Sequence, residues 1–468
     1  MKKIFLIILC LFSLNVYSQG NNLIEKPKVD ERVELLSIVF RLADAKEYSS
    51  NRFKLYTEKI DSYFGKYKNH ELIQFVKQIR SENGIGFDQV MEMAIHLGGA
   101  PKFKPLVKLT DSIPSVNWGK KNTEKFINLL NQFYQDAHCK EFFNDNKEFY
   151  ASVSEKFQPV FENIDLDWYK SFYGVEPKEK FRIVNGLGNG DGNYGPDIVF
   201  KNGTREVYAI MGTWNVDSLG MAKFNLNDYF PTLIHEFNHS FINTIVEKNI
   251  KSFEKSGEKI YEVVGKQMGN QAYGDYKIML YEALVRASVI KYMKDHKFEK
   301  AVIDNEFNEQ LNRGFIWINE LVKELEKYGN QRNKYPTLES YMSNIVNAYS
   351  NYANNIDSLK NNLNQKRPKV ILINEFANGS QDVDADIKTI TINFDRVMRD
   401  GYSFDKGLKG ESFLPEVLNV EFDEARKKII LSIKLLKNKE YQFMVTNYGF
   451  KSLEGIAIEN YEINFKTK

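Results

Sequence analysis

Cysteine is almost absent from this chain, which has only Cys10 and Cys139 among its 468 residues. Cys10 falls inside residues 1–18, which have the pattern of a cleaved secretory signal peptide, so Cys139 would be the only cysteine of the mature chain. An intramolecular disulfide is therefore excluded, and core packing must stabilise the fold. The chain also lacks a later run of roughly 18 apolar residues, so no transmembrane segment is expected.

An excess of charge of one sign is missing as well. The chain carries 64 Lys and Arg against 62 Asp and Glu, and Lys2 and Lys3 of the leader account for the difference. A nucleic acid or an anionic membrane is not an expected partner, because both require a clustered basic excess. The hydrophobic share of 43% is enough for true cores, so we expect a folded chain.

Residues 1–18 have the pattern of a secretory signal peptide: two lysines, an apolar run and a short polar end. We therefore expect a secreted protein, whether periplasmic, at the cell surface or extracellular. A lipid anchor on Cys10 is not expected, because a leucine precedes it where a lipidation signal has a small residue.

Histidine is scarce, with six in the chain, yet two of them form the motif His235-Glu236-Phe-Asn-His239. On a helix, positions i and i+4 share a face, so both imidazoles can bind one metal ion. A bound zinc ion lowers the pKa of its water to about 7, and Glu236 can serve as the general base. The alternative is a pair of ordinary core histidines.

The surrounding residues predict the helix that carries this motif. An apolar stripe follows the helical period through the segment. We expect Asn227 or Asp228 to cap its N-terminus and Pro231 to lie in its first turn.

A catalytic zinc site usually has three protein ligands and one open position. The periodic segment 275–295 predicts a second helix, with Glu282 beside its apolar face and Arg286 one turn later to orient it. Asp275 and His296 are alternative ligands, and a surface ion pair is the alternative role for Glu282. Ile242 and Ile245 replace the glycine and histidine of the metzincin motif, so that class is excluded.

The motif together with Glu282 on a following helix resembles the gluzincin arrangement of zinc peptidases. The resemblance implies one zinc ion per chain on His235, His239 and Glu282, with Glu236 as base. The sequence around Glu282 reads Tyr-Glu-Ala-Leu-Val-Arg-Ala, which differs from the corresponding motif of the best-known gluzincins. The whole central region also resembles an uncharacterised family of secreted bacterial zincin-like proteins.

Before the motif, periodic segments predict a helical lobe over residues 30–180, with Asp30 capping the first helix and one helical stretch over 146–172. Three short strands follow within 180–212, the first two separated by a glycine-rich loop. By resemblance to zincins, segment 205–212 would be an edge strand that aligns substrate. The glycine-rich loop could then line the cleft, with Asn193 or Tyr194 as the oxyanion donor. The alternative is that the loop is a plain flexible turn. Four tyrosines are further candidates, by residue type alone, for the hydrogen-bond donor that stabilises the transition state: Tyr273, Tyr276, Tyr281 and Tyr341.

After the motif, helical patterns cover 305–327 and 337–363, and a charged linker at 364–369 marks a domain boundary. Six or seven strands then predict a β-sandwich. This segment resembles bacterial Ig-like domains of surface-layer and secreted proteins through Phe376-Ala-Asn-Gly-Ser-Gln-Asp-Val-Asp384, Ile390-Thr-Ile-Asn-Phe-Asp395 and Leu435-Leu-Lys-Asn-Lys-Glu-Tyr441. The resemblance implies a spacer or adhesion module that contacts a cell-surface glycan or protein.

The sequence as a whole predicts an α+β protein: a mainly helical zincin-like domain with a small sheet at 19–365, followed by an all-β Ig-like sandwich at 366–468. The predicted metal-site helices lie within 228–296. The predicted function is a secreted zinc peptidase acting on a protein or peptide, with Arg286 and Tyr281 as supporting residues. The alternatives are a cell-surface binding or adhesion protein with a structural or degenerate metal site, and a metal-dependent hydrolase of non-peptide amides.

Overall fold

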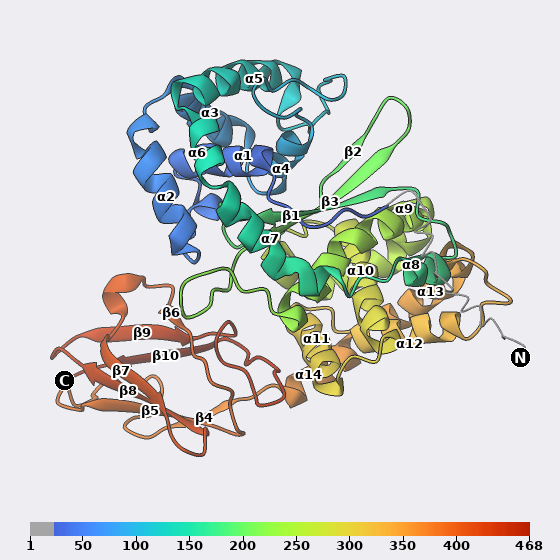
Figure 1. The fold of residues 1–468 in the computed structure, drawn as a ribbon. Coiled ribbons are helices and arrows are strands. Elements are labelled where there is room, and N and C mark those ends of the chain that lie inside the picture. The colour runs from blue at the N-terminus through green and yellow to red at the C-terminus, as the bar shows by residue number, and fades with distance from the viewer. Residues whose placement is uncertain (1–22) are drawn as a thin grey trace, which may run out of the picture. The chain divides into compact units, whose positions relative to one another are not determined.

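The computed structural model describes residues 23–468 and shows an α+β protein, as predicted (Figure 1). Contacts between residues divide the chain into two compact units. The first contains the residues up to Ile164 together with Pro177–Tyr229, and the second contains Asp165–Glu176 together with Phe230–Lys468. The predicted signal peptide lies outside the described residues. Within residues 23–468, no helix is both long and apolar enough to cross a membrane.

The first unit is mainly helical, as predicted for residues 30–180. Its α-helices are α1 (Glu31–Leu42), α2 (Lys54–Phe64), α3 (Glu71–Asn83), α4 (Asp88–Ile95), α5 (Gly119–Asp136), α6 (Cys139–Asp145) and α7 (Lys147–Phe161). Asp30 caps α1 as predicted, since its side chain accepts a hydrogen bond from the Arg32 amide. The expected single helix over 146–172 is wrong. Asp165 accepts the amides of Asp167 and Trp168 and thereby starts a separate helix, α8 (Leu166–Tyr173), which belongs to the second unit.

A small sheet completes the first unit, formed by β1 (Lys180–Gly186), β2 (Asp197–Val199) and β3 (Arg205–Gly212) in the order β1-β3-β2. β1 and β3 are parallel, and their pairing runs without a shift from Lys180 opposite Glu206 to Gly186 opposite Gly212. β2 is antiparallel to β3. The predicted small sheet at 180–212 is therefore present (Figure 1).

The predicted edge position of segment 205–212 is wrong, because β3 is the central strand of this sheet. β1 pairs with one side of β3 along its length. On the other side β2 pairs with its first residues, and Tyr194 forms a bridge with Ile210. An added substrate strand needs unpaired backbone groups, so β3 cannot align a peptide in this way.

The glycine-rich loop that follows β1 is anchored in the first unit and is not a free turn. The Glu34 carboxylate on α1 is fully buried and accepts hydrogen bonds from the Leu187 and Gly188 amides, at 2.7 and 3.0 Å. Gly190 has φ +69°, and a Cβ there would lie 2.5 Å from the Glu47 carbonyl oxygen. Only glycine fits this close approach.

The helices of the second unit are α8, α9 (Leu226–Gly269), α10 (Tyr276–Asp295), α11 (Lys300–Asn312), α12 (Ile318–Gly329), α13 (Leu338–Asn354) and α14 (Ile356–Lys366). The first residues of α9, up to Tyr229, belong to the first unit. The predicted helix over 305–327 is two helices, because Gly314 has φ +99° and interrupts the chain between α11 and α12.

The expected start of α9 is also wrong. The Asn225 carbonyl already accepts the amides of Asp228 and Tyr229, at 3.1 and 3.0 Å, so the helix begins at Leu226. Asn227 and Asp228 therefore lie inside the helix, and Pro231 is its sixth residue. A proline there leaves one intrahelical hydrogen bond unformed, without ending the helix.

The C-terminal part is a sandwich of two antiparallel sheets, in agreement with the predicted six or seven strands (Figure 1). One sheet has the order β4-β5-β8-β7 and the other β10-β9-β6. The strands are β4 (Val370–Ile373), β5 (Thr389–Phe394), β6 (Phe404–Lys406), β7 (Glu416–Phe422), β8 (Lys428–Lys434), β9 (Glu440–Val445) and β10 (Tyr461–Lys466). Alternate residues of both sheets form one core, which includes Ile429, Leu431, Phe443 and Phe465.

The sandwich is joined to α11 by hydrogen bonds within the second unit. Asn312 at the end of α11 donates to the Gly455 carbonyl and accepts from the Ala457 amide, both at 2.8 Å. At the predicted linker, α14 continues to Lys366, and Arg367 donates to the Ala457 carbonyl at 2.7 Å. The contact-based division thus groups the sandwich with the helices from Phe230 onward, whereas the sequence predicts a boundary near residue 365.

Candidate metal centre

His235 and His239 lie one turn apart on α9, and their side chains converge. Their Nε2 atoms are 3.1 Å apart, and their rings are nearly perpendicular, at 86°. The surrounding α9 residues Ile234, Phe237 and Ile242 are fully buried. The helical spacing of the motif therefore produces the predicted pair of imidazoles on one face, held by a buried apolar stripe.

The buried residue Asn238, within the motif itself, fixes the position of α9. Its Oδ1 accepts a hydrogen bond from the Tyr173 hydroxyl of α8 at 2.9 Å, and its Nδ2 donates to the Val285 carbonyl of α10 at 3.5 Å. A buried amide needs such partners, so these contacts favour one relative position of the helices. Sequence reasoning did not identify Asn238. The signal was an asparagine on the buried side of the predicted helix.

Glu282 on α10 completes the cluster with the two histidines. Its Oε1 lies 3.4 Å from His239 Nε2, and its Oε2 lies 3.6 Å from His235 Nε2. In the described part of the chain, these three residues form the one group of His, Cys, Asp or Glu suited to hold a metal ion.

The separations within the cluster fit a zinc ion. Zinc–ligand bonds of about 2.0–2.1 Å in tetrahedral geometry place neighbouring donor atoms about 3.3 Å apart. The 3.1 Å between the two Nε2 atoms and the 3.4 Å between Glu282 Oε1 and His239 Nε2 lie close to that value, and one ligand atom from each of the three residues lies within 4.8 Å of the others. The donor set of two imidazoles and one carboxylate is also one that zinc takes in catalytic sites. With three protein ligands, such an ion would keep one coordination position open for water or substrate.

Two side chains orient the Glu282 carboxylate. Arg286 Nη2 donates to Glu282 Oε2 at 2.8 Å, and the Tyr273 hydroxyl donates to the same oxygen at 3.1 Å. Arg286 Nη2 also donates to the Tyr273 hydroxyl at 2.8 Å, while its Nη1 donates to Gln310 at 3.1 Å. Both donors converge on Oε2, so Oε1 is left as the oxygen for a metal.

Arg286 lies where the i,i+4 spacing predicts, and it is buried. Burial disfavours a charged guanidinium, but the nearby charge of Glu282 raises the pKa of Arg286 above its usual value. A buried carboxylate requires such a compensating cation. The pair is therefore a fixed support for Glu282, and not the surface ion pair of the alternative interpretation.

The surroundings of the two histidines suit metal ligands. Burial, followed by the positive charge of Arg286, lowers the pKa of His235 well below its usual value, so its imidazole is neutral at pH 7. His239 Nδ1 lies 3.1 Å from Asn243 Oδ1, which can accept its N–H. That hydrogen bond leaves the Nε2 lone pair of His239 directed at the cluster.

Glu236 is next to the cluster and is 9% exposed. Burial raises the pKa of Glu236 to about 7, and the negative charge of Glu282 acts in the same direction, against the opposing effect of His239. A carboxyl group that titrates near neutral pH can both accept and return a proton. Its environment therefore suits the predicted role of general base.

The two alternative ligands, Asp275 and His296, make contacts outside the cluster. Asp275 caps α10 by accepting the amides of Lys277 and Ile278. His296, at the opposite end of α10, has its Nε2 3.0 Å from Asp165 Oδ2. Neither belongs to the cluster.

The remaining predicted residues have the following contacts. The Tyr281 hydroxyl donates to Glu247. In the first unit, Asn193 accepts the Gly212 amide, and the Tyr194 ring stacks on Tyr48. The roles of Asn193, Tyr194 and Tyr281 toward a substrate stay predictions. Tyr273 was a candidate by residue type, but its contact with Glu282 was not expected.

These observations define an α+β protein with a cluster of three side chains, on two helices, that is suited to hold a metal ion. Residues 26–348 match a family model described as a domain of unknown function, DUF4932, and the chain belongs to this family. The matched region includes every residue of the cluster, Glu236, Tyr273 and Arg286. It ends before the sandwich.

Comparisons with other proteins are less informative. No curated protein matches the chain. The surface layer protein SbsC, domains 1–6, is 12% identical with a TM-score of 0.18, and the alignment covers 85% of this chain but 46% of SbsC. The N-terminal part of SbsC gives 12% identity and a TM-score of 0.17, with 85% and 79% covered. Such low TM-scores do not establish a shared fold.

Proposed function

We propose that this protein is a secreted zinc-dependent peptidase with a zincin-like catalytic domain and a C-terminal Ig-like module. The main support is the arrangement of His235, His239 and Glu282, whose ligand atoms lie close enough together to share one metal ion. The two-sheet sandwich supports the Ig-like resemblance, and the N-terminal sequence supports export.

A zinc ion held by these three side chains would supply a Lewis acid and a water molecule of lowered pKa. Glu236 would accept a proton from the attacking water molecule while the water oxygen bonds to the carbonyl carbon of the substrate. As the C–N bond breaks, Glu236 would return the proton to the leaving nitrogen. The products are a carboxylic acid and an amine, and no other reactant is needed.

Two features favour an enzyme over a binding protein with a structural metal site. Structural zinc sites usually have four protein ligands, whereas this cluster has three. A structural site also has no use for a partly buried acid beside it, yet Glu236 lies there with its pKa raised to about 7. The same chemistry cleaves peptide bonds and other amides, so the experiment uses both kinds of substrate.

The test is hydrolysis of a peptide library by the purified zinc-loaded chain, with products identified by mass spectrometry and non-peptide amides assayed in parallel. We expect Glu236→Gln to reduce the rate by about a hundredfold or more, because general acid–base catalysis typically contributes that much. The matched control is Glu262→Gln, an exposed position further along α9. Absence of peptide cleavage, or equal cleavage by Glu236→Gln, would refute the proposal.

A further inference from the structure

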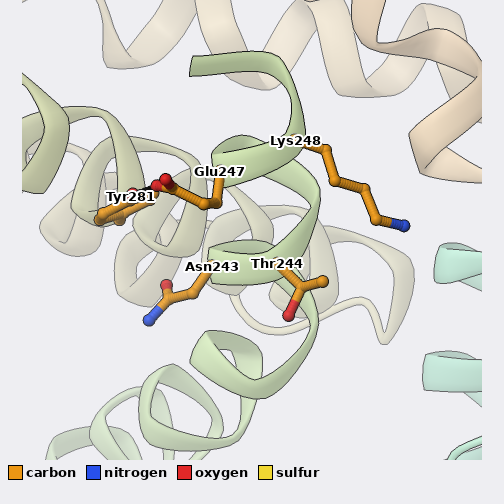
Figure 2. A pocket seen from close by; sticks show the side chains of 5 residues that line it. All are labelled: Asn243, Thr244, Glu247, Lys248 and Tyr281. Atoms are coloured by element: carbon orange, nitrogen blue, oxygen red, sulfur yellow. Dashed lines mark hydrogen bonds between the residues drawn. The ribbon is translucent and has the colours of Figure 1, made fainter.

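A surface pocket lies next to the cluster of His235, His239 and Glu282, one helical turn further toward the C-terminal end of α9. It has a volume of about 440 Å³ and is lined by Asn243, Thr244, Glu247, Lys248 and Tyr281. Four of these residues come from α9, and Tyr281 comes from α10 (Figure 2). None of them takes part in the proposed proton transfers, and only Asn243 has a role at the cluster, as the hydrogen-bond acceptor for His239.

Two residues connect the pocket to the cluster. Asn243, one turn after His239, accepts from the ring of that histidine at 3.1 Å. Tyr281 immediately precedes Glu282 on α10. From His239 to Glu247 the helix rises about 12 Å, which corresponds to three or four residues of extended peptide. A substrate whose scissile bond lies at the cluster can therefore reach the pocket.

The pocket contains a carboxylate that has no cationic partner. Glu247 accepts a hydrogen bond from Tyr281 through Oε2, and none of the ion pairs found within residues 23–468 involves it. The neighbouring Lys248 is already paired with Glu339, at 2.8 and 3.1 Å. Figure 2 shows Glu247 and Tyr281 meeting on one side of the helix, while Lys248 extends toward the other.

These features determine what the pocket can bind. The hydroxyl of Tyr281 fixes one oxygen of Glu247 and leaves Oε1 free to accept a hydrogen bond from a ligand. The Tyr281 ring offers an aromatic surface next to that oxygen, which is favourable for a cation. A negatively charged group would meet the unpaired Glu247 and would be repelled.

We propose that this pocket is a specificity subsite for a cationic nitrogen group of the substrate, bound by Glu247 and Tyr281. The proposal rests on the proposed function and adds to it a preference for peptides with a positive charge within about four residues of the scissile bond. The cation is either a lysine or arginine side chain or the free N-terminus of a peptide, since both present N–H donors to a carboxylate.

The experiment measures peptide binding and cleavage separately. Zinc-loaded Glu236→Gln protein is titrated with ten-residue peptides that carry one lysine at successive positions, or glutamine in its place. Each peptide is made with a free and with an acetylated N-terminus. The same peptides are then given to the active protein, and kcat/KM is measured. Glu247→Gln is compared with the matched control Glu262→Gln.

We expect lysine at the preferred position, or a free N-terminus, to improve affinity and kcat/KM by about tenfold, as is typical of a charge-assisted hydrogen bond. Glu247→Gln should remove this preference, Glu247→Lys should reverse it in favour of glutamate-containing peptides, and Glu262→Gln should retain it. The acetylated series identifies which of the two cations is recognised.

Equal affinity for lysine and glutamine peptides at every position, or a preference that survives Glu247→Gln, would overturn the subsite. This outcome is distinct from failure of the proposed function. Cleavage of peptides without a cationic preference would contradict the subsite alone. A Glu247-dependent preference in binding without any cleavage by the active protein would uphold the subsite and contradict the peptidase.

Discussion

Replacing Tyr273 by phenylalanine should weaken zinc binding about tenfold. The phenol is one of two donors to Glu282 Oε2, at 3.1 Å, and Arg286 is the other, at 2.8 Å. A hydrogen bond to a charged group contributes about 1.5–3 kcal/mol. Because Arg286 still holds the same oxygen, we expect the lower end of that range to be lost, which is close to tenfold in Kd. Loss of a group that orients a metal ligand commonly costs 10- to 100-fold in affinity.

The assay is competition for zinc between the protein and a chromophoric chelator at fixed pH. Tyr276→Phe is the matched control, because it removes a tyrosine hydroxyl from the first residue of α10, three positions after Tyr273, where no hydrogen bond to Glu282 is found among the described residues. Circular dichroism should show that both variants are folded. A zinc Kd for Tyr273→Phe within twofold of wild type would refute the conclusion that Tyr273 helps to orient the Glu282 ligand.

Two further predictions concern stability. Burial, followed by the charges of Asp88 and Asp197, raises the pKa of Glu92 from 4.5 to about 7 in the folded protein. The folded state therefore holds this proton more tightly than the unfolded chain does. The resulting stabilisation is fully present below pH 4.5 and is lost as the pH rises to about 7. Across this range Glu92→Gln should gain about 3 kcal/mol relative to wild type in urea unfolding, and a pH-independent difference would contradict this. Asn312→Ala removes two hydrogen bonds between α11 and the sandwich and should lower the free energy of unfolding by about 1–3 kcal/mol. No change in the midpoint of denaturation would show that these bonds contribute nothing.

The sequence was most informative where the geometry is local. The spacing of His235 and His239 follows from the helical repeat, so their convergence could be predicted from five residues. Glu282 could be selected because an acid beside the apolar face of a predicted helix needs a cation, and Arg286 lies at i+4 on that helix. These predictions needed no knowledge of how the two helices pack against each other.

Contacts that depend on packing could not be predicted. Tyr273 lies between α9 and α10, and its hydrogen bond to Glu282 depends on how those helices pack. Asn238 reaches both α8 and α10, which are distant in sequence. Strand order is equally non-local. Segment 205–212 was recognisable as a strand, but its central position depends on the loop that returns along its second side.

Helix boundaries were the least predictable part of the fold. Pro231 indicated a helix start, yet the Asn225 carbonyl accepts two amides and begins the helix earlier. Asp165 caps a new helix in a segment that looks continuously periodic. The sandwich strands were easier, because alternation as in Lys428–Lys434 is itself the pattern of a strand buried on one face.

The most direct test of the central claim is the zinc content of the purified chain, measured by elemental analysis after dialysis, for wild type and for the His235→Ala and Glu282→Ala variants. The three-ligand centre predicts one equivalent of zinc in wild type and a large loss in each variant, while Glu236→Gln retains the metal. Wild-type protein that holds no zinc and acquires none at micromolar concentration would contradict the metal centre and the function built on it.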